Sequence, residues 1–198
     1  MSFDSVQAFV KGYLLPTKLN PAHDGLSPIH KDRLLRSVEQ QQFLYGVQEV
    51  KDVLVLICGH GGRDMRCGIT GPILRDEFEK CLPTKNIEIL KGPIETAQTD
   101  ERMAPPAFGP EEPARTARVG LISHVGGHKF AGNIILYIPP GSKAVDGTAH
   151  ALAGCGIWYG RVEPKHVEGI IQETVLSGKV IEDLFRGGIR QGGEILRL

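Results

Sequence analysis

The sequence has few cysteines, no excess of charge of either sign and no long apolar run. Four cysteines among 198 residues are too few for the disulfide framework of a small secreted domain, so intracellular metal or redox use is expected of them. Lysine and arginine together number 23, as do aspartate and glutamate. Such a neutral chain lacks the broad basic surface that binds phosphate backbones, and no nucleic-acid partner is expected.

The longest apolar runs, at 53–58 and 134–138, have the length of strands. Crossing a bilayer takes roughly 20 apolar residues, so no membrane span is expected. Residues 1–19 include Asp4 and lack both the apolar block of a signal peptide and the Arg-rich, acid-free composition of a transit peptide. On composition the protein is expected to be intracellular.

Hydrophobic spacing predicts the order of helices and strands along the chain. Short runs rich in β-branched residues and leucine predict strands at 52–58, 86–90, 118–122, 134–138 and 157–162. Apolar residues at helical spacing predict helices at 5–13, 31–47, 72–82, 164–177 and 180–185. Pro72 and Pro164 are expected in first turns, where a helix tolerates proline because those N–H groups need no intrahelical acceptor.

Strands that alternate with helices indicate an α/β domain. Because only a short loop joins the strands at 118–122 and 134–138, we expect a mixed sheet flanked by helices, as in a thioredoxin-like sandwich. This domain is assigned to residues 51–198. Residues 1–50 are predicted to form a helical and extended N-terminal segment, which is either an extension of the domain or the remnant of a preceding region. The Pro-rich stretch 93–115 is predicted to be a surface insertion.

Two thiols and two imidazoles follow predicted strands. Cys58 and Cys67 lie in VLVLICGHGGRDMRCGITG (53–71), and His124 and His128 lie in SHVGGHKFAGN (123–133). Thiolate and imidazole ligands suit either zinc or an iron–sulfur cluster, so the residue types leave both open. Structural zinc sites usually separate paired cysteines by about two to four residues, whereas eight separate Cys58 from Cys67. A loop of that width favours a dinuclear cluster.

The motifs CGHGGRDMRCG and HVGGHKFAGNIILY resemble those of the sucrase/ferredoxin-like family, in particular its fungal branch of thioredoxin-like ferredoxins. The resemblance covers about residues 53–185, including WYGRV and LFRGG. It implies one [2Fe-2S] cluster, with Cys58 and Cys67 on one iron and His124 and His128 on the other. It also implies a flavin or ferredoxin-type donor and a role in redox or thiol homeostasis, in the mitochondrial matrix or, alternatively, in the cytosol.

Such a ligand set has chemical consequences of its own. Two neutral imidazoles in place of two thiolates make the cluster easier to reduce, as in Rieske centres. The second nitrogen of each imidazole can hold a proton, so we expect electron transfer to be coupled to proton transfer. The protein is expected to act as an electron carrier more than as a stand-alone enzyme.

Three alternatives remain open for the same residues. Cys58 and His60 reproduce the first half of a Rieske motif, but neither Cys67 nor Cys155 has a histidine three residues later. A zinc-stabilised binding module would use the same four ligands without redox chemistry. A thiol oxidoreductase would use the two cysteines of the first motif, although the thioredoxin-type CxxC is absent.

The remaining polar residues of the first motif are assigned structural roles. Arg63 and Asp64 are expected to fix the shape of the Gly-rich loop, because such loops need internal hydrogen bonds. His60 is a loop residue that either bonds to a cluster sulfur or has no role in the site. Cys81 is predicted to be an inert core thiol and Cys155 a small residue ahead of a strand.

Overall fold

The computed structural model describes residues 3–92 and 115–197, with the side chain of His128 excepted. The helices are α1 (Phe3–Phe9), α2 (Pro28–Leu34), α3 (Met65–Thr84) and α4 (Pro164–Ile170). The strands are β1 (Val53–Cys58), β2 (Ile87–Ile89), β3 (Arg115–Ile122), β4 (Ile134–Tyr137), β5 (Gly156–Tyr159), β6 (Phe185–Ile189) and β7 (Ile195–Leu196). The chain divides into two compact units, Met1–Glu49 and Val50–Leu198.

The first unit is made of short helical segments. α1 continues as a π-helical turn over Val10–Leu14, so the helix predicted at 5–13 is confirmed. The helix predicted at 31–47 is wrong, because α2 ends at Leu34 and a separate 3-10 segment follows. The N–H groups of Arg36 and Ser37 donate to carbonyls of the preceding segment, each at 2.9 Å. These long-range hydrogen bonds keep the backbone at Arg36 and Ser37 out of a continuous helix, although the apolar spacing of the segment is compatible with one.

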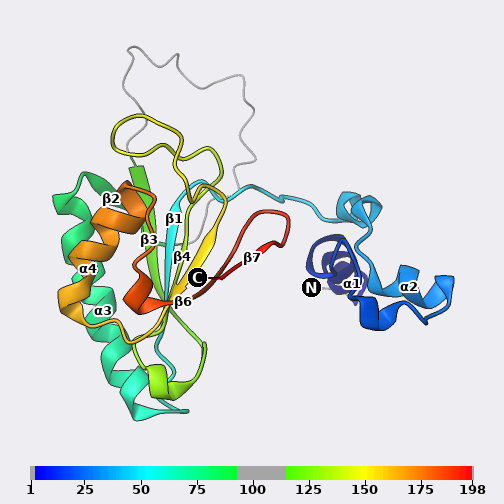
Figure 1. The fold of residues 1–198 in the computed structure, drawn as a ribbon, viewed down its shortest axis with the longest axis horizontal. Coiled ribbons are helices and arrows are strands. Elements are labelled where there is room, and N and C mark those ends of the chain that lie inside the picture. Colours follow the sequence, from blue (N-terminus) through cyan, green and yellow to red (C-terminus); the bar gives the residue numbers. More distant parts are fainter. Residues whose placement is uncertain (1–2, 93–114, 198) are drawn as a thin grey trace. The chain divides into compact units, whose positions relative to one another are not determined.

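The second unit contains a mixed seven-stranded sheet in the order β2-β3-β1-β4-β5-β6-β7 (Figure 1). The pairs β2–β3 and β3–β1 are parallel, and the pairs from β1–β4 to β6–β7 are antiparallel. The central order β3-β1-β4-β5, with one parallel and two antiparallel pairs, is that of a thioredoxin-like sheet. The predicted fold class is therefore confirmed, although most of the insertion predicted at 93–115 lies outside the described residues.

The core of this unit lies between the sheet and α3, which contacts β1, β2 and β3. α3 runs beside α4 in Figure 1, and the two helices are in contact. Leu74, Phe78 and Leu82 are spaced by four residues and fully buried, so they form one apolar stripe against Val55 and Ile57 of β1. Burial of each such side chain contributes about 1.5–3 kcal/mol.

Two helix predictions in this unit require correction. α3 begins at Met65, seven residues before the predicted start at Pro72, because the side chain of Asp64 caps the helix there. Pro72 therefore lies inside the helix. The helix predicted at 180–185 is wrong: only Glu182–Leu184 forms a 3-10 turn, and the chain then enters β6, which pairs with β5.

The other strand and helix predictions are confirmed within a few residues, except that β5 ends at Tyr159 rather than at 162. The strand ends there because the N–H of Gly160 donates to the carbonyl of Leu184 at 2.9 Å and the backbone of Arg161 has a positive φ of 59°. α4 continues as a π-helical segment over Ile171–Leu176 and ends at Gly178 with φ of 71°. The helix end predicted at 177 is thus confirmed, and a glycine with positive φ follows it.

Candidate metal centre

The cysteine and histidine motifs leave the sheet side by side because β1 and β3 are parallel neighbours. Cys58 ends β1 directly opposite Ile122, which ends β3, and the N–H of Gly59 donates to the Ile122 carbonyl at 3.1 Å. Two residues further on, the rings of His60 and His124 face each other with centroids 6.3 Å apart and planes tilted by 57°. Strand register therefore brings two motifs that are distant in sequence to one sheet edge.

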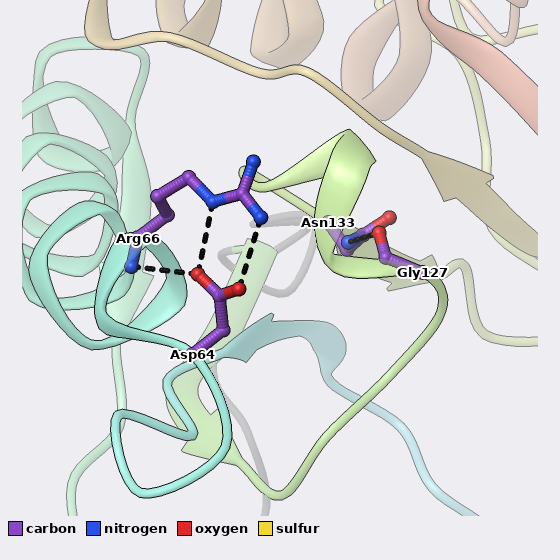
Figure 2. A network of polar contacts seen from close by, with 4 residues as sticks. All are labelled: Asp64, Arg66, Gly127 and Asn133. Carbon is purple, nitrogen blue, oxygen red and sulfur yellow. Dashed lines mark hydrogen bonds and ion pairs between the residues drawn. The ribbon is translucent and has the colours of Figure 1, made fainter.

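Cys67 lies in the first turn of α3, not in a loop as the sequence suggested. Asp64 caps this turn by accepting from the N–H of Arg66 at 2.9 Å, and its carboxylate also accepts from Nε and Nη2 of Arg66 at 3.0 Å each (Figure 2). The predicted structural role of Asp64 is therefore visible, with Arg66 rather than Arg63 as its partner. A cysteine at a helix N-terminus is placed where the helix dipole favours thiolate.

Glycines bring that first turn against the end of β1. A Cβ added to Gly68 would lie 2.6 Å from Cα of Gly61, and one added to Gly71 would lie 2.7 Å from the carbonyl oxygen of Cys58. Real Cβ atoms do not approach backbone so closely. The two glycines, one helical turn apart, thus allow α3 to pack directly on the loop that follows Cys58.

This packing brings the two thiols together in the interior. Cys58 is 1% exposed and Cys67 is fully buried, and neither forms a disulfide. Burial, the adjacent Cys58 thiol and the charge of Asp64 raise the pKa of Cys67 to about 11, against the opposing effect of Arg66. A protonated thiol is a poor nucleophile. A bound metal removes this proton, because thiolate is the form that coordinates.

His124 contributes an unpaired ring nitrogen to the same sheet edge. Its Nδ1 is buried and has no hydrogen-bond partner among the described residues. Leaving such an atom unpaired costs about 1–3 kcal/mol, and coordination of a metal would remove that cost. His128 begins the 3-10 turn His128–Phe130, and the structure describes its backbone only.

Asn133, which sequence reasoning did not single out, links the two motifs. Its carbonyl accepts from the N–H of Cys58 at 3.0 Å, and its buried side chain donates to the carbonyl of Gly127 at 3.4 Å (Figure 2). Gly126 packs against this amide at a positive φ of 73°, where an added Cβ would lie 2.5 Å from the Trp158 ring. The only available signal was an asparagine at the start of an apolar strand.

The donor set fits a thiolate and imidazole centre in part. Cys58 and Cys67 are in contact, and His124 lies on the neighbouring strand end with a free nitrogen. Within the described side chains, which exclude that of His128, no three Cys, His, Asp or Glu groups are close enough to hold one metal ion. The soft thiols and the orphaned imidazole nitrogen are the donors that zinc and iron–sulfur centres use.

The other two cysteines occupy packing positions. Cys81 lies on α3 against the core, and its thiol donates to Glu77 Oε1 at 3.3 Å. Cys155 is 2% exposed directly before β5. Burial raises the pKa of both thiols, with Glu77 adding to the effect at Cys81. Neither thiol is placed for nucleophilic chemistry.

Comparison with known protein families identifies the family of this chain. A model of the sucrase/ferredoxin-like family matches residues 1–187. The chain belongs to the sucrase/ferredoxin-like family.

Among the curated relatives of this family member are proteins named altered inheritance of mitochondria protein 32. The one from Meyerozyma guilliermondii is 31% identical over 90% of this chain and 49% of its own length. The one from Debaryomyces hansenii is 31% identical over 91% of this chain and 52% of its own length. The one from Candida glabrata is 37% identical over 70% of this chain and 33% of its own length. The chain thus spans about half the length of the first two relatives.

One solved structure, described as a thioredoxin-like [2Fe-2S] ferredoxin from Aquifex aeolicus, aligns with 73% of this sucrase/ferredoxin-like chain and 99% of its own. The sequence identity is 14% and the TM-score is 0.41. In the described part of the chain, none of the helices is both long and apolar enough to cross a membrane.

Proposed function

We propose that the protein is an electron carrier that binds one [2Fe-2S] cluster through two cysteines and two histidines: Cys58, Cys67, His124 and His128. The observation that carries this proposal is the buried pair of touching thiols at a sheet edge where His124 Nδ1 has no hydrogen-bond partner among the residues that the structure describes. Membership of the sucrase/ferredoxin-like family supports it.

The protein's own residues bind, orient and enclose the centre. Cys58 is fixed at the end of β1 by its N–H bond to Asn133, and Cys67 is fixed by the cap of α3. Both thiols are shielded from water, which strengthens the interaction of their thiolates with a cation. A bound [2Fe-2S] cluster would supply a one-electron redox centre whose potential is raised by the two neutral imidazoles.

The proton belongs to His124 in this proposal. With Nδ1 as the nitrogen that is free to bind, Nε2 would carry the ring proton, and a bound cluster would couple this proton to its electron. We expect the midpoint potential to fall as pH rises over an alkaline window. A potential that stays flat across the histidine titration range would contradict proton coupling while leaving the cluster itself in place.

Visible spectroscopy and electron paramagnetic resonance test the centre. The anaerobically purified protein should absorb in the visible and bleach with dithionite, whereas a zinc-stabilised module would be colourless. In the reduced protein, nitrogen couplings should weaken on His128→Cys and remain unchanged in the matched control His23→Cys, which alters an exposed histidine of the 3-10 turn Pro21–His23. Unchanged couplings in His128→Cys would remove His128 from the site.

The thiol oxidoreductase alternative is tested by a different variant. His124→Ala should abolish the visible absorption if the cluster is the functional centre, whereas thiol exchange by Cys58 and Cys67 would survive this change.

The cellular role proposed here follows from family membership alone. The electron donor is a flavin or ferredoxin-type protein, and the pathway is redox or thiol homeostasis. The relatives are named for altered inheritance of mitochondria, and we place this protein in the mitochondrial matrix, with the cytosol as the alternative. Fractionation of cells that express the tagged full-length protein separates the two compartments.

A further inference from the structure

Three cationic side chains surround Phe130, a phenylalanine within the histidine motif. The guanidinium carbon of Arg186 lies 3.7 Å from the centroid of the Phe130 ring, Nζ of Lys129 lies 4.9 Å from it and the guanidinium carbon of Arg161 lies 5.0 Å from it. All three are within the roughly 6 Å at which a cation is attracted to an aromatic ring. We call these four residues the Phe130 patch.

The fold, and not local sequence, assembles the Phe130 patch. The N–H of Arg161 donates to the carbonyl of Phe130 at 3.2 Å, which ties the turn after His128 to the chain that leaves β5. Arg161 holds a φ of 59°, a conformation that residues with a side chain rarely adopt. Next to it, Gly160 has no side chain, and a Cβ there would lie 3.1 Å from Cγ of Arg186.

The three charges are exposed and uncompensated. Lys129, Arg161 and Arg186 are all exposed, and none has an ion-pair partner within residues 3–92 and 115–197. The nearest acid along the chain from Arg161, Glu163, pairs with Lys165 at 2.7 Å. On a chain with no net charge, a cluster of three unpaired cations is a local concentration of positive potential.

The cations are also held in place before any partner binds. Stacking on Phe130 restricts the long Lys and Arg side chains, so less rotamer entropy is lost when a carboxylate binds to them. Lys129 directly follows His128, and the patch therefore adjoins the histidine side of the candidate metal centre.

We propose that the Phe130 patch is the docking surface for an acidic, Asp- and Glu-rich face of the redox partner protein. The inference rests on the proposed electron-carrier function, since it identifies where and by which chemistry the partner binds. Rim charges of this kind mainly raise the rate of association and fix its orientation. Docking here would place the partner at the turn His128–Phe130, beside the histidine side of the candidate metal centre.

A protein partner fits the patch better than nucleic acid. Nucleic-acid binding relies on many phosphate contacts along a basic surface, and this chain has three clustered cations on a neutral background. The aromatic ring in the middle of the cations is typical of protein interfaces, which are enriched in aromatic residues and arginine.

The binding test uses fluorescein-labelled decaglutamate as a probe of the purified full chain, measured by fluorescence anisotropy. We expect binding at about 10 mM salt that is largely lost at about 0.5 M salt, because the Debye length shortens severalfold. Each exposed ion pair contributes up to about fivefold in affinity. The triple variant Lys129→Gln, Arg161→Gln, Arg186→Gln should therefore bind on the order of tenfold more weakly.

Two controls separate the patch from total charge and from unfolding. The variant Lys18→Gln, Arg33→Gln, Lys51→Gln removes the same charge from other exposed positions and should bind the probe within about twofold of the wild type. The double variant Arg161→Lys, Arg186→Lys keeps the charge and should bind much more tightly than the triple variant. Thermal melting confirms that each variant is folded.

Rates of electron transfer test whether the charges of the Phe130 patch attract a redox partner. Stopped-flow oxidation of the dithionite-reduced protein should be faster with the hexacyanoferrate(III) anion at low salt than at high salt, and the reverse should hold for tris(phenanthroline)cobalt(III). The triple variant should lose about tenfold in the low-salt rate with the anion only. Equal loss with both oxidants would overturn the assignment.

The outcomes distinguish this inference from the proposed function. Decaglutamate binding that survives the triple substitution refutes the docking surface, whatever the cluster does. Patch-dependent binding by a protein without visible absorption refutes the electron-carrier function, and with it the assignment of the partner as a redox protein. Complete competition by equimolar inorganic phosphate, or tighter patch-dependent binding of a single-stranded oligonucleotide, would replace the protein partner with a small anion or a nucleic acid and overturn the proposal.

Discussion

The contact between α3 and the end of β1 provides the sharpest test of how the candidate centre is built. Gly71→Ala would put a methyl group 2.7 Å from the Cys58 carbonyl oxygen and 2.9 Å from Cα of Gly59. Neither neighbour is a flexible side-chain tip, so backbone must move. Overpacking of this kind costs about 1–3 kcal/mol. Helix propensity acts in the opposite direction, since alanine in a helix is about 1 kcal/mol more favourable than glycine.

The chain contains a matched control for the propensity term. Gly169 lies in α4, is exposed, and has no heavy atom within 4 Å of where a Cβ would be. Gly169→Ala should therefore raise the free energy of unfolding by up to about 1 kcal/mol. The difference between the two variants isolates the overpacking, and it should be about 1–3 kcal/mol.

Urea unfolding followed by circular dichroism measures this difference, provided that the m-values agree. Visible absorbance per mole of protein, after anaerobic reconstitution, measures the consequence for the site. Gly71→Ala should bind less cluster because displacement of α3 separates Cys67 from Cys58, whereas Gly169→Ala should load like the wild type. Equal unfolding midpoints and equal absorbance for both variants would refute the close helix-to-loop contact.

Three further predictions concern single groups. Burial lowers the pKa of His150 below its ordinary 6.5, so the unfolded chain binds the proton more readily and stability falls as pH drops below about 6.5. His150→Gln should therefore reduce the dependence of the urea midpoint on pH between pH 7.5 and 5. An unchanged pH dependence in this variant would contradict the argument. Asp64→Ala should cost about 1 kcal/mol by uncapping α3, and calorimetry should find Asp64→Asn close to the wild type because asparagine also caps helices. Tyr159 is buried, and its hydroxyl forms a hydrogen bond with that of Thr174 at 2.7 Å. Tyr159→Phe should therefore lower the free energy of unfolding in urea by about 1–3 kcal/mol. The control Tyr45→Phe, at a side chain that is 95% exposed, should leave the free energy of unfolding unchanged.

Two of the failed helix predictions have different causes. The segment 31–47 has an apolar spacing compatible with one helix, but hydrogen bonds from Arg36 and Ser37 to the preceding segment stabilise extended chain in the middle. The start of α3 was predicted too late because the proline at 72 was given more weight than the cap at Asp64. Local patterns rank such alternatives weakly: long-range hydrogen bonds decided the first case, and a local helix cap decided the second.

Strand β6 shows a similar limit for predicting strands. Phe185–Ile189 contains two adjacent glycines, which weaken any intrinsic preference for a strand. Pairing with β5 and then β7 stabilises it as a strand nevertheless. Strand propensity depends on the neighbours that pack beside a segment, and those neighbours are unknown before the fold is formed.

The amino-acid sequence identified the candidate metal-binding groups and placed each of the two motifs at the end of a strand, because these features lie within short contiguous motifs. It also determined the α/β class through hydrophobic periodicity. Only the tertiary structure decided that β1 and β3 are adjacent and in register, so that Cys58 and His124 reach one edge. The Asn133 link and the Phe130 patch were decided there too. Contacts between residues far apart in sequence depend on strand order and close packing, which no local pattern of residues records.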